Sequence, residues 1–415
     1  MRRNVHRRRA AFAAFLVVMG PGIITGFAGN DAGGVTTYTA AGARFGFALL
    51  WLLLIASLSL VIVQEMCARM GAVTGKGLSD LIRERFGVRW TIVAMLALFI
   101  ANASNVVAEY AGIAASLGLV GVPPWASVPV AGIVVWALIV FASYRVVERA
   151  LFALILAFIA YPVSIAILHP DWSEVGRGFL PTMANDPAVL VMALALVGTT
   201  VTPYLLFYLQ ASVVDKGIDR ESFASARLDA ILGATLAGLF AFFILVVSGT
   251  VLFPAGVPAQ TAAQAAQALR PLAGEAAGLL FGVGLLAASL LGLTVMPLST
   301  SYAICEAFGW ESGISHDFRD APVFMGLVTF LLAAGGAIVL LVPKEQLLPL
   351  IVVSQAVNGL LLPIVLVFIM RLASDPSVMG SDANGRVRGT LGWGIAGLTG
   401  SLSIAYLVAS ALGIG

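Results

Sequence analysis

The sequence predicts an all-α polytopic membrane protein with about eleven transmembrane helices, and three observations lead to this fold class. The 415 residues are 60% hydrophobic and only 11% charged, with a mean hydropathy of +1.01, which leaves too few polar side chains to cover a water-soluble protein. Apolar stretches of about 20 residues, long enough to cross a membrane as a helix, follow one another along the chain. Long apolar runs such as 48–63 lack the alternation of β-barrel strands. A soluble enzyme is therefore excluded.

Apolar windows between charged and Pro/Gly-rich clusters define the individual spans. They lie near residues 12–43, 46–68, 91–119, 126–143, 147–168, 187–213, 228–253, 275–305, 322–342, 346–370 and 390–413. We expect residues 1–11 to form a basic N-terminal arm and residues 12–415 to form a single transmembrane domain.

The distribution of basic residues predicts the orientation of the chain. If the N-terminus is cytoplasmic, 19 of the 23 lysines and arginines fall on the cytoplasmic side. This asymmetry follows the positive-inside rule and predicts a multi-pass protein of the cell membrane with a cytoplasmic N-terminus. The basic run at residues 2–9 fits this topogenic role better than a nucleic-acid or anionic-lipid patch, so no nucleic-acid partner is expected.

Two of the predicted spans contain helix breakers at membrane depth. Residues 26–34 of the first span read GFAGNDAGG, with four glycines, an asparagine and the carboxylate of Asp31. Glycine and asparagine are poor helix formers, and a carboxylate near the bilayer centre is costly without a partner. In the sixth span Pro203 cannot donate to the carbonyl of Thr199, which is left free. We expect both segments to be unwound.

Paired breaks in the first helix of each half favour a substrate site between two inverted repeats. The repeats would cover residues 12–168 and 187–370 approximately, with an extra helix near 390–413. The alternative is that the breaks are kinks that pack closely against neighbouring helices, which is the preferred interpretation for Pro203 taken alone.

The ionisable residues that we expect inside the membrane are few: Asp31, Glu65 and Glu109. Glu65 precedes Arg69 by four residues, a spacing that predicts a structural ion pair. Glu109 could be a titrating relay or a structural hydrogen-bond partner, and the sequence leaves both interpretations open. Asp31 lies in the unwound segment itself, where a carboxylate among free carbonyls forms the all-oxygen environment that hard divalent cations prefer.

Polar residues in the tenth span and the positions of the histidines add to this picture. Gln355 and Asn358 share a helix face, and for Asn358 an interhelical hydrogen bond is the preferred interpretation. All three histidines, His6, His169 and His316, fall outside the predicted spans, which removes serine–histidine and zinc-dependent intramembrane proteolysis. An enzyme is therefore a weaker prediction than a transporter, and no pore-loop repeat supports a channel.

At these same residues the chain resembles the Nramp family of divalent-metal transporters, and the resemblance covers most of its length. The segments GPGII at 20–24, DAGG at 31–34, FG at 45–46 followed by LW at 50–51, and GAVTGK at 71–76 appear in the family's order. The resemblance implies a LeuT-like fold with a 5+5 inverted repeat and discontinuous first and sixth helices. This agrees with the two predicted breaks.

The resemblance also implies a set of metal ligands. The family's metal-binding aspartate corresponds to Asp31, its two carbonyl ligands correspond to Ala28 and Thr199, and its glutamine in span ten corresponds to Gln355. Thr202 stands at the position of the family's methionine ligand and would offer a hydroxyl or a water contact.

Other positions depart from the family's pattern. Gly34 replaces a ligand asparagine and Tyr204 replaces a histidine, so these two residues, with Asn30, are candidate site-lining residues. In span three the family's Asp-x-x-Glu begins with Val106 here, so the aspartate is missing and Glu109 alone remains as a candidate relay. Loss of the thioether and amide predicts a harder and larger site with room for retained waters.

This pattern resembles the Nramp-related magnesium transporters, a branch associated with Mg²⁺ and Mn²⁺ and thought not to couple to protons. We therefore expect alternating-access transport of Mg²⁺ and Mn²⁺ without proton coupling. The metal is cargo, no cofactor is expected, and the expected partners are the metal ion and membrane lipid, with no obligate protein partner evident. The alternatives are a proton-coupled Mn²⁺/Fe²⁺ Nramp transporter with degenerate motifs and a non-transporting membrane receptor or scaffold of the same fold.

Overall fold

The computed structural model describes residues 20–181, 187–257, 275–314, 316–341 and 344–411, and within these ranges the chain is helical with no strand. The helices are α2 (Pro21–Ala28), α3 (Ala32–Phe45), α4 (Leu50–Thr74), α5 (Leu78–Phe86), α6 (Val88–Gly118), α7 (Pro124–Phe141), α8 (Tyr144–Ala157), α9 (Ala160–Leu168), α10 (Trp172–Arg177), α11 (Pro187–Thr200), α12 (Pro203–Asp215), α13 (Phe223–Val251), α15 (Glu275–Phe308), α16 (Pro322–Leu341), α17 (Lys344–Ala373), α18 (Pro376–Met379) and α19 (Arg386–Ala411), with a 3-10 turn at Gly380–Asp382. The predicted basic arm at 1–11 lies outside the described residues.

Nine helical segments of the described residues are long and apolar enough to cross a membrane. They coincide with predicted spans two to nine and eleven: Leu50–Thr74, Val88–Gly118, Pro124–Phe141, Arg145–Leu168, Ala188–Asp215, Phe223–Val251, Gly278–Phe308, Pro322–Leu341 and Arg386–Val408. The predicted first span is the pair α2 and α3, and the predicted tenth span is α17. The prediction of an all-helical polytopic membrane protein is confirmed.

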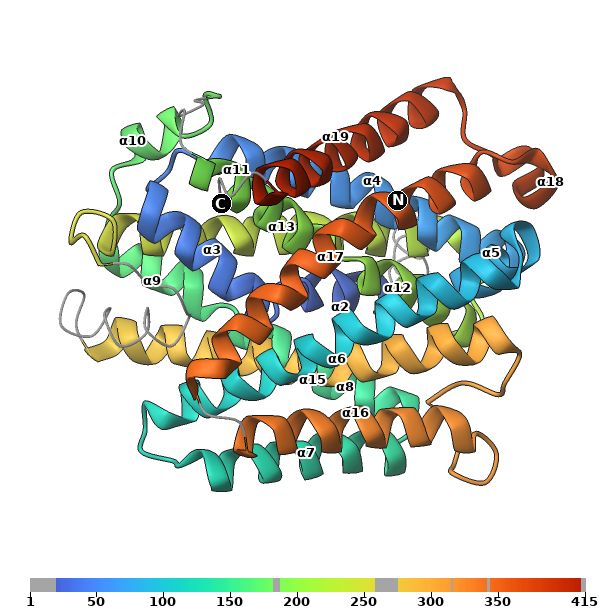
Figure 1. The fold of residues 1–415 in the computed structure, drawn as a ribbon, viewed down its shortest axis with the longest axis horizontal. Helices are drawn as coiled ribbons and strands as arrows, with labels where there is room; N and C mark the ends of the chain where they lie inside the picture. Colours follow the sequence, from blue (N-terminus) through green and yellow to red (C-terminus); the bar gives the residue numbers. More distant parts are fainter. Residues whose placement is uncertain (1–19, 182–186, 258–274, 315, 342–343, 412–415) are drawn as a thin grey trace, which may run out of the picture.

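The interrupted helices occupy the interior of the molecule (Figure 1), with α2 and α3 packed against α13 and with α11 and α12 close to α4. The long helices α6 and α15 pack against each other beside this centre. Helices α7 and α16 lie side by side along one edge, where each exposes much of its apolar surface. The polar breaks are thus surrounded by other helices, and the outer helices supply the surface that faces lipid.

Glycines allow α2 to touch the backbone of α13 directly. A Cβ atom on Gly26 would lie 2.4 Å from the carbonyl carbon of Gly233, and one on Gly233 would lie 2.1 Å from the carbonyl oxygen of Gly22. No side chain fits at either position, and such close approach gives extensive van der Waals contact between helices in a membrane. The start of α2 is held to the same helix, because the carboxylate of Asp229 accepts hydrogen bonds from the amides of Gly20 (3.1 Å) and Gly22 (2.7 Å).

The predicted ion pair between Glu65 and Arg69 is present at 3.6 Å. Two further arginines approach the same carboxylate, with Arg227 at 3.2 Å and Arg388 at 3.9 Å. The buried Arg69 guanidinium also donates to the carbonyl of Asp382 at 2.6 Å. Glu65 therefore connects α4 to α13 and α19, which agrees with the structural role predicted for it.

Candidate metal site

The first interruption is a short segment in which residues 29–31 separate α2 from α3. The predicted break over residues 26–34 is thus correct in position but too long, since α3 already begins at Ala32. The physical reason is a helix cap: Asp31 is extended (φ −65°, ψ −177°) and its Oδ1 accepts a 2.6 Å hydrogen bond from the amide of Gly34. This cap offsets the poor helix propensity of the glycines that follow.

The second interruption separates α11, which ends at Thr200, from α12, which begins at Pro203. Proline has no amide hydrogen to bond the carbonyl of Thr199. The hydroxyl of Thr202 takes this place, lying 2.8 Å from the Thr199 carbonyl oxygen and 3.2 Å from that of Gly198. The predicted break is confirmed, and the carbonyl that it frees is engaged by the side chain of Thr202.

The two interruptions meet in the interior of the protein. The hydroxyl of Tyr204 lies 2.6 Å from the carbonyl oxygen of Ala28 and 3.0 Å from Oδ2 of Asp31, and it donates to these two acceptors. On the other side of the break, a Cβ atom on Gly34 would be 3.5 Å from Oγ1 of Thr199. The structure therefore brings together candidate ligands that lie about 170 residues apart in the sequence.

The space beside Gly34 is filled by backbone. A Cβ atom at this position would lie 2.6 Å from the carbonyl oxygen of Gly29 and 3.4 Å from Oδ1 of Asp31. Glycine therefore opens no space at its own Cβ position in this structure, because the chain between α2 and α3 folds back over the position that a longer side chain would occupy. The expectation of room for retained waters in the site stays a prediction.

Glu109 of α6 also reaches the start of α3. Its Oε2 accepts a 3.1 Å hydrogen bond from the amide of Ala32, and its Oε1 is buried with no hydrogen-bond partner among the described residues. A Cβ atom on Gly292 of α15 would be 2.6 Å from Cδ of Glu109 and 3.1 Å from Cβ of Asp31, so this glycine lets both acidic side chains approach the same point. Both carboxyl groups lie at the N-terminus of α3, where the helix dipole favours negative charge.

Three further candidate residues lie elsewhere or are only partly described. The amide of Asn30 donates a 3.0 Å hydrogen bond to the carbonyl of Ala237 on α13, so it serves helix packing in this structure. Gln355 is part of α17, but the position of its side chain lies outside the described residues. Asn358 is buried, and neither of its amide atoms has a hydrogen-bond partner among the described residues, so the interhelical bond expected for it is not seen.

Some residues around the site were missed by the sequence reasoning. Asp229 caps α2, and its place near the start of the predicted seventh span was a usable signal. Tyr38 of α3 lies 3.1 Å from Oγ1 of Thr200, and Ser299 of α15 donates to the carbonyl of Tyr204 at 2.7 Å. Nothing in the local sequence distinguishes these two residues, because their roles depend on helix packing.

The donor atoms around the interruptions are all oxygen. They comprise one carboxylate, from Asp31, the carbonyls of Ala28 and Thr199, and the hydroxyls of Thr202 and Tyr204. Among the described residues no group of three or more His, Cys, Asp or Glu side chains could hold a metal ion. A cation bound here would therefore depend on backbone and hydroxyl oxygens, a set that suits hard cations better than soft ones.

Interrupted helices that meet around a buried carboxylate define a membrane protein of the LeuT-like class. Solved structures support this fold: MHP1, a nucleobase-cation-symport-1 family transporter, matches with a TM-score of 0.58 at 13% identity, covering 95% of this chain and 93% of that chain. The manganese transporter of Eremococcus coleocola, solved in complex with an aromatic bis-isothiourea compound, matches with a TM-score of 0.78 at 20% identity, covering 95% and 86% respectively.

The chain belongs to the Nramp family. Its residues 22–409 match the family described as "Natural resistance-associated macrophage protein-like". It is also 30% identical over 400 residues to the divalent metal cation transporter MntH of Ralstonia nicotianae, a match that covers 90% of this chain and 86% of that protein. The family resemblance expected from the sequence is confirmed, and the relatives are named as transporters and not as enzymes.

Proposed function

We propose that this protein transports divalent metal cations, Mg²⁺ and Mn²⁺, by alternating access and without proton coupling. The observation that carries the proposal is the convergence of Asp31, the Ala28 carbonyl and the Thr199–Thr202 turn at the junction of two interrupted helices. The names of the relatives, a divalent metal cation transporter and a manganese transporter, support a metal ion as the cargo.

Binding of the cation requires three hydrogen bonds to be exchanged for metal–oxygen contacts. The hydroxyl of Tyr204 leaves the Ala28 carbonyl and Asp31, and the hydroxyl of Thr202 turns away from the Thr199 carbonyl. Each move frees one oxygen lone pair or more, without deprotonating a side chain. Gln355 would add an oxygen when α17 approaches on occlusion, and the remaining positions would be filled by waters that the ion retains. Mg²⁺ tolerates this arrangement because it dehydrates reluctantly.

The absence of sulfur from the proposed ligand set favours Mg²⁺ as a substrate beside Mn²⁺. Thioether ligands select softer metals, and Thr202 offers only oxygen at the position where the family carries methionine. We do not expect a proton to be transported with the metal, since Val106 stands where the family carries an acidic residue in span three. Glu109 would then act through the hydrogen bond that its Oε2 accepts from the amide of Ala32.

Mn²⁺ uptake into proteoliposomes, with external Mg²⁺ as competitor and a pH-sensitive dye in the lumen, tests this proposal. We expect millimolar Mg²⁺ to slow Mn²⁺ uptake and the lumen pH to stay constant. Insensitivity to Mg²⁺ together with metal-dependent acidification would instead support the proton-coupled Mn²⁺/Fe²⁺ alternative. A correctly folded protein that gives no ion flux would support the receptor or scaffold alternative.

A further inference from the structure

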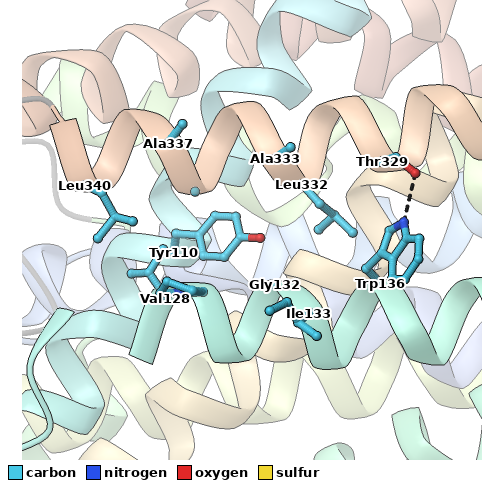
Figure 2. Close-up of a pocket in the computed structure, with 12 residues that line it drawn as sticks. Tyr110, Val128, Gly132, Ile133, Trp136, Thr329, Leu332, Ala333, Ala337 and Leu340 are labelled. Atoms are coloured by element: carbon cyan, nitrogen blue, oxygen red, sulfur yellow. Dashed lines mark hydrogen bonds between the residues drawn. The ribbon is translucent and has the colours of Figure 1, made fainter. Parts of the chain in front are cut away.

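Two surface features of the described helices have no part in the metal site. One is an apolar pocket between α7 and α16, where Trp136 donates a 2.9 Å hydrogen bond to the hydroxyl of Thr329 (Figure 2). Its lining residues carry no charge, so they distinguish no ligand from the hydrocarbon of the membrane. The other is a group of three arginines, Arg69, Arg227 and Arg388, which we call the arginine cluster. Its charge makes this second feature selective for one class of ligand.

The arginine cluster converges on one carboxylate. Nε of Arg227 lies 3.2 Å, and a terminal nitrogen of Arg388 lies 3.9 Å, from the same atom, Oε1 of Glu65. Arg69 approaches the other carboxylate oxygen at 3.6 Å. The packing of the helices explains this convergence, because α13 and α19, which carry Arg227 and Arg388, both contact α4. Three positively charged groups therefore share one negative charge.

No second carboxylate balances the excess charge. Among the described residues, none besides Glu65 comes within ion-pair distance of the three guanidinium groups. The sequence of α19 contains no acidic residue. Acidic residues of nearby elements are engaged elsewhere: Asp229 with the amides of Gly20 and Gly22, Asp375 with Arg85, and Asp382 with Arg220. Like charges held together in this way repel one another, and an anion carried by a ligand would offset the repulsion.

The guanidinium groups also have hydrogen-bond donors to spare. The side chains of Arg227 and Arg388 are 45% and 41% exposed, and the 3.9 Å contact of Arg388 with Glu65 is too long for a hydrogen bond. The buried Nε of Arg69 has no hydrogen-bond partner among the described residues. Because the nearest nitrogens of Arg227 and Arg388 share one oxygen of Glu65, they lie within about 7 Å of each other. A phosphate group that accepts hydrogen bonds of about 2.8 Å bridges two guanidinium groups at this spacing.

The arginine cluster lies where membrane spans end. Arg227 is the fifth residue of α13, Arg388 is the third residue of α19, and Arg69 is the sixth residue from the end of α4. All three helices are candidate membrane spans. The neighbours of the two exposed arginines are apolar and exposed themselves, with Leu228 at 47% and Val387 at 74%. An anion that reaches the cluster therefore also meets lipid-facing surface, which is the position of a phospholipid headgroup above its acyl chains.

We propose that the arginine cluster binds the headgroup phosphate of an anionic phospholipid such as phosphatidylglycerol. Arg227 and Arg388 donate hydrogen bonds to the phosphate oxygens, and Arg69 contributes its charge from the buried side. The single negative charge of a phosphodiester leaves the cluster with a net positive charge, so Glu65 does not prevent binding. The bound lipid connects α13 to α19 across the end of α4.

Native mass spectrometry of the full-length protein in detergent tests this proposal, with phosphatidylglycerol and phosphatidylcholine of the same acyl chains as probes. We expect the parent protein to bind one phosphatidylglycerol with at least roughly fivefold higher affinity than phosphatidylcholine. Millimolar inorganic phosphate should leave that lipid bound, because the free ion has no acyl chains to place against the apolar surface. Equal affinity for the two lipids would overturn the proposal, and displacement by millimolar phosphate would assign the cluster to a soluble anion instead.

Charge variants locate the bound lipid at the cluster. Arg227→Gln and Arg388→Gln should each lower the affinity for phosphatidylglycerol by roughly fivefold, the effect of one basic residue beside an anionic lipid. Arg89→Gln removes an exposed arginine at the start of α6, another candidate membrane span, and should leave the affinity unchanged. Parent-like affinity in both cluster variants, or the same loss in Arg89→Gln, would refute the cluster as the site. The comparison of the two lipids needs only the parent protein, so it holds even if a variant is unstable.

Discussion

The hydroxyl of Tyr204 donates to the carbonyl oxygen of Ala28 over 2.6 Å, across the junction of the two interrupted helices. The same hydroxyl is 3.0 Å from Oδ2 of Asp31, so one donor serves two atoms that we assign as metal ligands. A cation can use both oxygens only after this hydroxyl has moved or turned its lone pair toward the ion. Tyr204 therefore competes with the metal in the structure described here.

Removal of this hydroxyl should strengthen metal binding. We expect Tyr204→Phe to raise the affinity for Mn²⁺ by roughly fivefold, the effect of about 1 kcal/mol for one hydrogen bond that no longer has to be broken. Calorimetric titration of the purified protein with Mn²⁺ measures it. Tyr208→Phe, also on α12 and buried, is the matched control and should leave the affinity unchanged. Weaker binding in Tyr204→Phe would show that the hydroxyl is itself a ligand.

The charge of Asp31 should be essential for transport. Asp31→Asn keeps an oxygen that can cap α3 through Gly34, so the helix start is preserved while the negative charge is lost. We expect Mn²⁺ uptake into proteoliposomes to fall at least roughly tenfold in Asp31→Asn and in Asp31→Ala, since no other side chain among the proposed ligands is charged. Asp219→Ala, in an exposed loop, is the control. Uptake at the parent rate in either variant would remove Asp31 from the site.

Introduction of sulfur should change metal preference. Thr202→Met removes the hydroxyl that occupies the Thr199 carbonyl and adds a thioether at the same turn. We expect Cd²⁺ and Mn²⁺ to be favoured over Mg²⁺, because Mg²⁺ gains nothing from a soft ligand. Competition of each metal against Mn²⁺ uptake measures the change. Unaltered competition by Mg²⁺ in a variant that still transports would count against the proposed position of Thr202.

Restoring asparagine at Gly34 should damage the fold before it changes selectivity. A side chain here meets the Gly29 carbonyl at 2.6 Å, and relief of such a contact in a packed interior typically costs about 1–3 kcal/mol. We expect Gly34→Asn and Gly34→Ala to lower the midpoint of thermal unfolding in detergent. Gly326→Ala, with open space at the corresponding Cβ position, is the control. A parent-like midpoint for Gly34→Ala would mean that the break between α2 and α3 adjusts freely.

Transport should respond to membrane potential and leave the lumen pH unchanged. A net positive charge moving inward is favoured by about 2.3 kcal/mol per elementary charge for each 100 mV of inside-negative potential. We expect a K⁺–valinomycin potential to accelerate Mn²⁺ uptake in the parent and in Glu109→Gln, whose amide oxygen can still accept from Ala32. Acidification of the lumen that depends on metal and disappears in Glu109→Gln would restore the role of Glu109 as a proton relay.

The sequence predicts the elements of this site better than their contacts. Gly29, Asn30 and Pro203 are local signals, since each disfavours a helix wherever it occurs, and both breaks were found from them. The hydrogen bonds of Tyr204 depend on helices that meet only in the folded protein. The same is true of the close approach of Gly292 to Glu109 and Asp31. The same reason applies to Gly34. The sequence shows that a side chain is missing at this position, but it does not show that the carbonyl of Gly29 lies where that side chain would be.

The contacts of α2 recur at regular intervals along α13. Asp229 holds the start of α2, Gly233 touches its middle, and the Ala237 carbonyl accepts from Asn30 just beyond its end. These positions are four residues apart, so they form one stripe along α13. Any tilting of the short helix during a transport cycle must either carry α13 with it or break all three contacts together. If α13 moves with α2, a cross-link between these two helices should leave transport intact, whereas arrest by that cross-link would show that the three contacts break during the cycle.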